Sequence, residues 1–66
     1  MERRLLKPEE AANVLGMSLA WINKGRIAGY GPRFLRIGRR IFYDAADIQR
    51  WLDERPRHQS TSEVAG

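Results

Sequence analysis

The sequence predicts a small α+β domain, with two N-terminal helices followed by a two-stranded β-hairpin and a C-terminal helix. Three observations lead to this fold class. Apolar residues recur at helical spacing from 8 to 24, alternate with polar residues from 34 to 43, and return to helical spacing from 44 to 52. These two periods distinguish helices from strands. With 66 residues, 42% of them hydrophobic, the chain has room for one small core and no second domain.

The first helix is expected from Pro8 to Leu15. Proline suits the first helical position, because the N–H that it lacks would have no partner there, and acidic residues follow it near the positive end of the helix dipole. Gly16 then ends the helix. Lys7 stands where a capping residue is expected, and its side chain carries no acceptor, so no side-chain cap is predicted.

A second short helix is expected to begin after Ser18, an N-cap candidate, and to run to about Lys24. Only a short turn containing Gly16 separates it from the first helix. Two helices joined in this way have the form of a helix-turn-helix, whose second helix can lie in the major groove of DNA. Glycines and a proline then predict a loop from 25 to 33.

The segment FLRIGRRIFY, residues 34 to 43, alternates as a β-hairpin does. A three-residue turn at 38–40 would pair Ile37 with Ile41 across the hairpin. A two-residue turn would instead pair Ile37 with Arg40 and bring a charge onto the apolar face. The longer turn is therefore preferred.

The longer turn also pairs Leu35 with Tyr43, so that four apolar side chains face the core. The side chains that would then point outward are Phe34, Arg36 and Phe42. Two outward phenylalanines form an apolar patch, and we expect Phe34 and Phe42 to be candidates for contacts with another protein.

The last helix is expected to begin after Asp44, an N-cap followed three residues later by Asp47 in a spacing like that of a capping box. Trp51 is expected to anchor this helix in the core. Pro56 ends it, and residues 55–66 are polar, with too few apolar groups to offset the entropy of ordering them. A disordered tail is predicted there.

Basic and acidic residues are sorted along the chain, whose formal net charge is +4. No acidic residue occurs from Ala11 to Tyr43. The cations within that stretch are Lys24, Arg26, Arg33, Arg36, Arg39 and Arg40. Because a solvated surface normally mixes both signs, this sorting favours a surface that binds phosphates.

Several classes of protein are disfavoured. The chain has no cysteine, and its single histidine, His58, lies in the predicted tail, so no disulfide, thiolate site, histidine triad or multi-histidine metal site is expected. No glycine-rich phosphate loop occurs. We therefore expect no catalysis, metal or cofactor. No apolar run approaches the roughly 18 residues that span a membrane, and the start MERRLLKPEE lacks a signal peptide's apolar stretch, so a cytoplasmic, nucleoid-associated protein is expected.

Three segments, LLKPEEAANVLGMS, GYGPRFLRIGRRIFY and DAADIQRWL, together resemble the winged helix-turn-helix of the excisionase and MerR-like superfamily, which includes AlpA-type prophage regulators. The resemblance covers Leu5 to about Leu52, nearly all of a predicted domain at 1–54. It implies that the second helix enters the major groove, while the hairpin, called the wing, reaches an adjacent minor groove or the DNA backbone.

The residues that the resemblance places at or beside the groove are Ser18, Leu19, Ala20, Trp21, Asn23 and Lys24, with wing contacts from Arg36, Arg39 and Arg40. Arg26 and Arg33, from the same basic stretch, complete the expected DNA-binding set. The preferred function, which the minimal size supports, is that of an excisionase, a recombination directionality factor that bends attachment-site DNA for an integrase. Because a single module this small offers few base contacts, it is expected to bind DNA in tandem copies. An AlpA-like transcriptional regulator would share the module. A protein-interaction adaptor that uses Phe34 and Phe42 is the alternative from another class.

Overall fold

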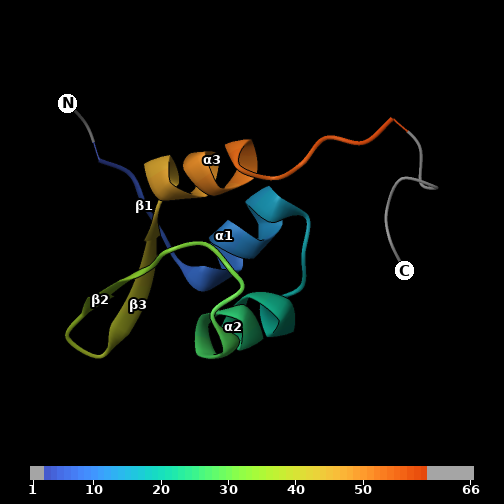
Figure 1. Ribbon diagram of the computed structural model, residues 1–66. Coiled ribbons are helices and arrows are strands. Elements are labelled where there is room, and N and C mark those ends of the chain that lie inside the picture. Colours follow the sequence, from blue (N-terminus) through green and yellow to red (C-terminus); the bar gives the residue numbers. More distant parts are fainter. Residues whose placement is uncertain (1–2, 60–66) are drawn as a thin grey trace.

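The computed structural model describes residues 3–59. The elements follow in the order β1 (Leu5–Leu6), α1 (Pro8–Leu15), α2 (Leu19–Ala28), β2 (Leu35–Ile37), β3 (Arg40–Asp44) and α3 (Ala45–Asp53). The antiparallel sheet has the order β1-β3-β2, and its β2–β3 hairpin extends away from the helices, with α1 between α2 and α3 (Figure 1). The predicted α+β class is confirmed. Within residues 3–59, no helix has the length and apolar character needed to cross a membrane.

The first helix has the predicted bounds. Its N-cap residue Lys7 contributes no side-chain acceptor, but the Lys7 backbone N–H donates to the Glu10 carboxylate at 3.0 Å, which supplies half of a capping box. Gly16 ends the helix with φ 70°, and its N–H donates to the Asn13 carbonyl at 3.1 Å. A left-handed residue at this place closes the helix and turns the chain toward α2.

The second helix is longer than predicted, because it continues past Lys24 to Ala28. Its start agrees with the prediction: the Ser18 hydroxyl oxygen accepts a hydrogen bond from the Trp21 N–H at 3.1 Å. The four additional residues form one more turn of helix, and they extend its exposed side toward the hairpin (Figure 1).

The prediction of a loop beginning at Gly25 is wrong, and Tyr30 supplies the physical reason. Glycine inside a helix costs about 1 kcal/mol relative to alanine. Here the Tyr30 ring packs directly on the buried Gly25, where an added Cβ would lie 2.9 Å from Tyr30 Cε1. The same ring lies 5.4 Å from that of Trp21, and the Tyr30 hydroxyl donates to the Trp21 carbonyl at 3.4 Å. Tertiary packing thus keeps the glycine helical.

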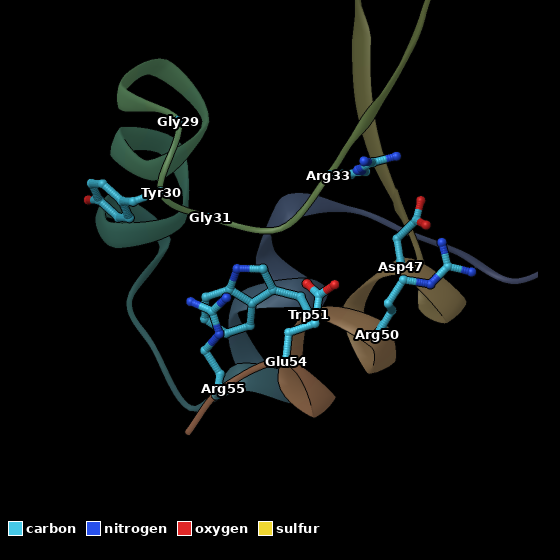
Figure 2. Close-up of a pocket in the computed structure, with 9 residues that line it drawn as sticks. All are labelled: Gly29, Tyr30, Gly31, Arg33, Asp47, Arg50, Trp51, Glu54 and Arg55. Atoms are coloured by element: carbon cyan, nitrogen blue, oxygen red, sulfur yellow. The ribbon is translucent and has the colours of Figure 1, made fainter. Parts of the chain in front are cut away.

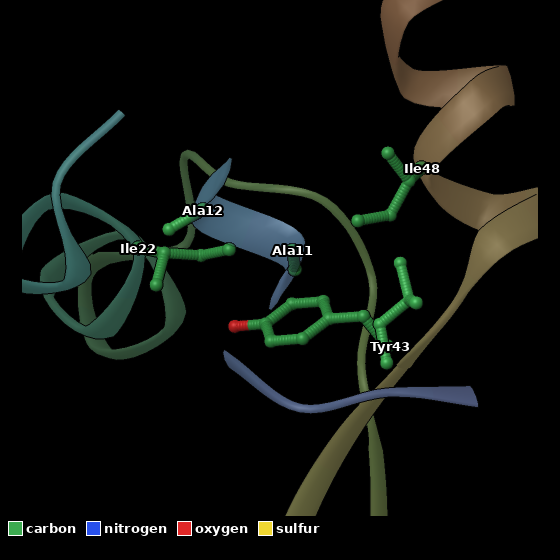
Figure 3. Close-up of a cluster of buried hydrophobic side chains, with 6 residues drawn as sticks. Ala11, Ala12, Ile22, Tyr43 and Ile48 are labelled. Carbon is green, nitrogen blue, oxygen red and sulfur yellow. The ribbon is translucent and has the colours of Figure 1, made fainter. Parts of the chain in front are cut away.

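The hydrophobic core joins all three helices to the sheet. Figure 3 shows the Tyr43 ring extending from β3 toward the side on which Ile22 of α2 lies, and Ile48 approaches from α3. Alanines on α1 allow the close approach of its neighbours. The buried residues are Leu6, Ala11, Ala12, Ile22, Tyr43 and Ile48. Tyr43, only 1% exposed, therefore connects the base of the hairpin to the helices.

The hairpin has the shorter of the two turns considered. Ile37 pairs with Arg40, which leaves Gly38 and Arg39 as a two-residue turn, so the three-residue turn is wrong. Gly38 has φ 62°, the positive value that the first position of a type II′ turn requires. The charge of Arg40 does not oppose this register, because the hairpin tip lies beyond the core and Ile37 itself is 52% exposed.

This register also changes which side chains face the core. Ile41 and Tyr43 face it, whereas Leu35 and Ile37 lie on the opposite face of the sheet, contrary to prediction. Phe42 points away from the core as predicted, whereas Phe34, although 42% exposed, packs on the core side with its ring 6.3 Å from that of Tyr43. The two phenylalanines therefore do not form a shared patch. The outer sheet face carries the apolar Leu5, Leu35, Ile37 and Phe42, with Arg40 across from Ile37 and Asp44 across from Leu5.

A third strand, β1, has no counterpart in the prediction. Leu6 pairs with Tyr43, and the Arg4 carbonyl accepts from the Ala45 N–H at 2.9 Å. The Arg3 guanidinium also lies 3.0 Å from the Asp44 carboxylate. Two leucines give no periodicity by which a strand could be recognised in the sequence. The strand fixes the start of the domain to the base of the hairpin.

The last helix begins as predicted, because the Asp44 carboxylate accepts from the Ala46 N–H at 3.0 Å. Trp51 does not join the buried core. It is half-buried, lies edge-on to the Trp21 ring with 6.0 Å between centroids, and is covered by the Arg55 guanidinium at 4.4 Å. Residues 55–59 form no helix or strand, and the remainder of the predicted tail, 60–66, lies outside the described residues.

Candidate nucleic-acid interface

One side of α2 is open to solvent along its whole length. Ala20, Lys24 and Ile27 lie on it at helical spacing, with the half-buried Asn23 beside them. The helix contains no acidic residue. We call this surface of Ala20, Asn23, Lys24 and Ile27 the exposed α2 face. Its dimensions and its lack of negative charge are compatible with the major groove of DNA.

Arg26 lies at the edge of this face and holds Asn23 in place. Its guanidinium donates to the Asn23 side-chain oxygen at 3.0 Å and, over a longer 3.5 Å, to the Tyr43 hydroxyl. It also lies 5.9 Å from the centre of the Phe34 ring. Since a guanidinium can only donate, the Asn23 oxygen must face Arg26, and the Asn23 amide nitrogen keeps its two N–H donors for another acceptor.

The three arginines of the hairpin surround its tip. Arg39 is in the turn, Arg36 lies across from Ile41 on the core side, and Arg40 is across from Ile37 on the other side. All three are exposed. Within residues 3–59, none of their guanidinium groups has a hydrogen bond or an ion pair. Their charges therefore remain available to an anion on either side of the wing.

A depression of about 410 Å³ lies between α2 and the wing. Arg26 of α2, Arg40 of β3 and Lys7 at the start of α1 contribute positive charge to its lining, against the single carboxylate of Glu9. The apolar floor is formed in part by Phe42. The exposed α2 face and the wing are thus connected by a surface that is itself net positive.

Two of the expected DNA-binding residues lie elsewhere. The Trp21 ring packs against Trp51 of α3 and against Tyr30, which follows α2. Arg33 lines a larger cavity of about 620 Å³ beside α3, together with Arg50 (Figure 2). Neither residue shares a depression with the wing arginines, although Arg33 also lines one of about 320 Å³ together with Arg26 of α2.

The other expected residues from Ser18 to Arg26 lie on or beside the exposed α2 face. Ser18 and Leu19 are at its N-terminal end, and Leu19 is 43% exposed. Ile27 lies at the opposite end of this face. The sequence interpretation missed it because the predicted helix ended at about Lys24. Gly29 was the available signal: with φ 86° it forms the helix C-cap, four residues after the glycine chosen as the end of the helix.

The fold defines the class of this protein. Two helices joined by a tight turn, followed by a β-hairpin and a third helix packed on the sheet, make a small winged helix-turn-helix. A family described as "Helix-turn-helix domain" matches residues 5–56, and the chain belongs to this family of DNA-binding helix-turn-helix proteins. No curated protein matches the chain.

Proposed function

We propose that this DNA-binding protein is an excisionase, which binds and bends attachment-site DNA and so directs an integrase toward excision. The observation that supports it best is the continuous basic surface from the exposed α2 face through the depression to the wing. A surface that follows two neighbouring grooves suits a protein that deforms DNA. The resemblance to excisionases adds to this argument.

The proposed division of labour follows from exposure and charge. Lys24 and the Asn23 amide would contact base edges from the major groove, while Arg39 at the tip of the wing would bind phosphates or a narrow minor groove. Arg26 would act by positioning Asn23, to which it is hydrogen-bonded. The protein would therefore act by shaping DNA, with no catalytic step of its own.

The test of this proposal is a recombination assay with the cognate integrase. We expect excision of a DNA carrying both attachment sites to require the protein, and a circularly permuted fragment to show a bend at its site. Specific binding with no effect on excision, but with altered transcription from the bound promoter, would favour the AlpA-like regulator. Failure to bind any duplex at low salt would favour the adaptor.

The outer sheet face supports a second part of the proposal, binding in tandem copies. Leu5, Leu35, Ile37 and Phe42 form an apolar strip, bordered by Arg40 and Asp44, on a face of the sheet that no helix covers within residues 3–59. A single module of this size offers about 600–1,000 Å² to DNA, so neighbouring copies would add affinity through protein contacts. Ile37, 52% exposed, is the strip residue whose replacement disturbs the fold least.

We expect the free protein to be monomeric and to fill a DNA with three adjacent sites cooperatively. Ile37→Ser should reduce the cooperativity more than the affinity for a single site, because Ile37 supplies apolar contact area and no charge that could bind a phosphate. Val14→Ser, at another exposed position, is the matched control. Sedimentation and titration of one-site against three-site DNA measure both quantities. Independent filling of the three sites by the parent protein would contradict this part of the proposal.

A further inference from the structure

Ile27 is the most exposed of the large apolar side chains between residues 3 and 59, at 86%. It lies in the last turn of α2, on the same side as Lys24 and Asn23. It makes no contribution to the buried core. Packing therefore does not explain why this position carries a branched apolar side chain.

The surroundings of Ile27 leave it prominent on the helix. Ala20 and Ala28, also exposed, are too short to cover it, and no acidic residue occurs in α2. An alkyl group that projects from a groove-binding helix between small neighbours can reach the floor of the groove. The feature on that floor that it suits chemically is the C5-methyl group of thymine.

We propose that Ile27 selects thymine at one position of the DNA site by packing against its methyl group. This inference rests on the proposed entry of α2 into the major groove. In that groove only an A·T pair presents a methyl group, and this group lies on the thymine. Apolar contact therefore distinguishes thymine from adenine, guanine and cytosine at that position. Ala20 and Ile27 are seven residues apart, or about 10 Å along the helix. Ile27 therefore faces a different base from the one opposite Ala20, at the other end of the helix.

The experiment begins with selection of the preferred duplex from a random library by the full chain. Each thymine of that site is then replaced singly by deoxyuridine, which lacks only the methyl group. Binding is measured by fluorescence anisotropy at one salt concentration. For the parent protein we expect one position at which this replacement weakens binding about fourfold, the effect of leaving one methyl group unburied.

Ile27→Ala should bind the thymine and deoxyuridine duplexes equally well at that position. Alanine has the higher helix propensity, so the variant should remain folded, as circular dichroism would verify. Val14→Ala removes alkyl groups from α1 instead, where Val14 is 59% exposed, and should keep the fourfold difference. If Ile27 had a merely structural role, Ile27→Ala would not lose the fourfold difference between the thymine and deoxyuridine duplexes while Val14→Ala kept it.

The inference fails if no thymine of the selected site shows the difference, or if Ile27→Ala retains it. Failure of the proposed DNA binding would be seen earlier and separately, because no duplex would then bind at low salt and no site would be selected. A site that contains no thymine on either strand would also overturn the role of Ile27, while leaving DNA binding intact.

Discussion

Replacement of Tyr43 by alanine is expected to lower the free energy of unfolding by about 3–5 kcal/mol, the range seen when a buried aromatic ring is deleted. The ring is 1% exposed and belongs to the cluster that joins the sheet to the helices. A domain of this size rarely has more than about 3–5 kcal/mol of stability in total. Most Tyr43→Ala molecules should therefore be unfolded at 25 °C, as urea titration followed by circular dichroism would show.

Tyr43→Phe is the matched control, because it keeps the ring and removes only the hydroxyl. That hydroxyl accepts a single long hydrogen bond from Arg26, at 3.5 Å. Its loss should lower the free energy of unfolding by less than about 1 kcal/mol. If Tyr43→Ala unfolded at the same urea concentration as the parent, the ring would not be the central packing element described above.

The second large effect concerns the wing. Replacing both Arg39 and Arg40 with alanine should weaken binding to all duplexes alike, by roughly 60-fold at 0.1 M salt if two phosphate contacts are lost. The slope of log K against log salt should become shallower by about 1.8, or about 0.9 for each contact. The fold should survive, because both side chains are exposed and unpaired within residues 3–59. Anisotropy titrations at several salt concentrations would measure both quantities.

The control for this variant removes the same charge from another surface. Arg50 and Arg55 line the cavity beside α3, and their double replacement by alanine should change the slope much less. An equal change in both variants would mean that the slope reflects the overall charge of the protein. In that case the wing would have no special role in binding phosphates.

Features decided within a few residues could be predicted from the sequence. Ser18 and Asp44 cap their helices as expected, since an N-cap needs only a side-chain oxygen near the N–H groups of the first turn. Gly16 likewise adopts the left-handed conformation that ends a helix. Such local chemistry defined the start of each helix and the end of the first.

Features that depend on distant parts of the chain could not be predicted in this way. Gly25 remains helical because the Tyr30 ring occupies the space beside it. The pairing of Ile37 with Arg40 depends on where the core ends, which the alternation of apolar residues does not reveal. The same limit applies to the candidate site: the family resemblance places Trp21 at the groove, yet its ring packs against Tyr30 and against Trp51 of α3.

The packing of Trp21 against Trp51 gives the protein an internal optical reporter. These are the two tryptophans of the chain, and their rings lie 6.0 Å apart across the boundary between α2 and α3. Tryptophan emission therefore arises from this boundary, and it responds to a displacement of one helix against the other. Rigid docking on DNA would leave the tryptophan emission unchanged, whereas movement of α2 against α3 would alter it without any attached dye.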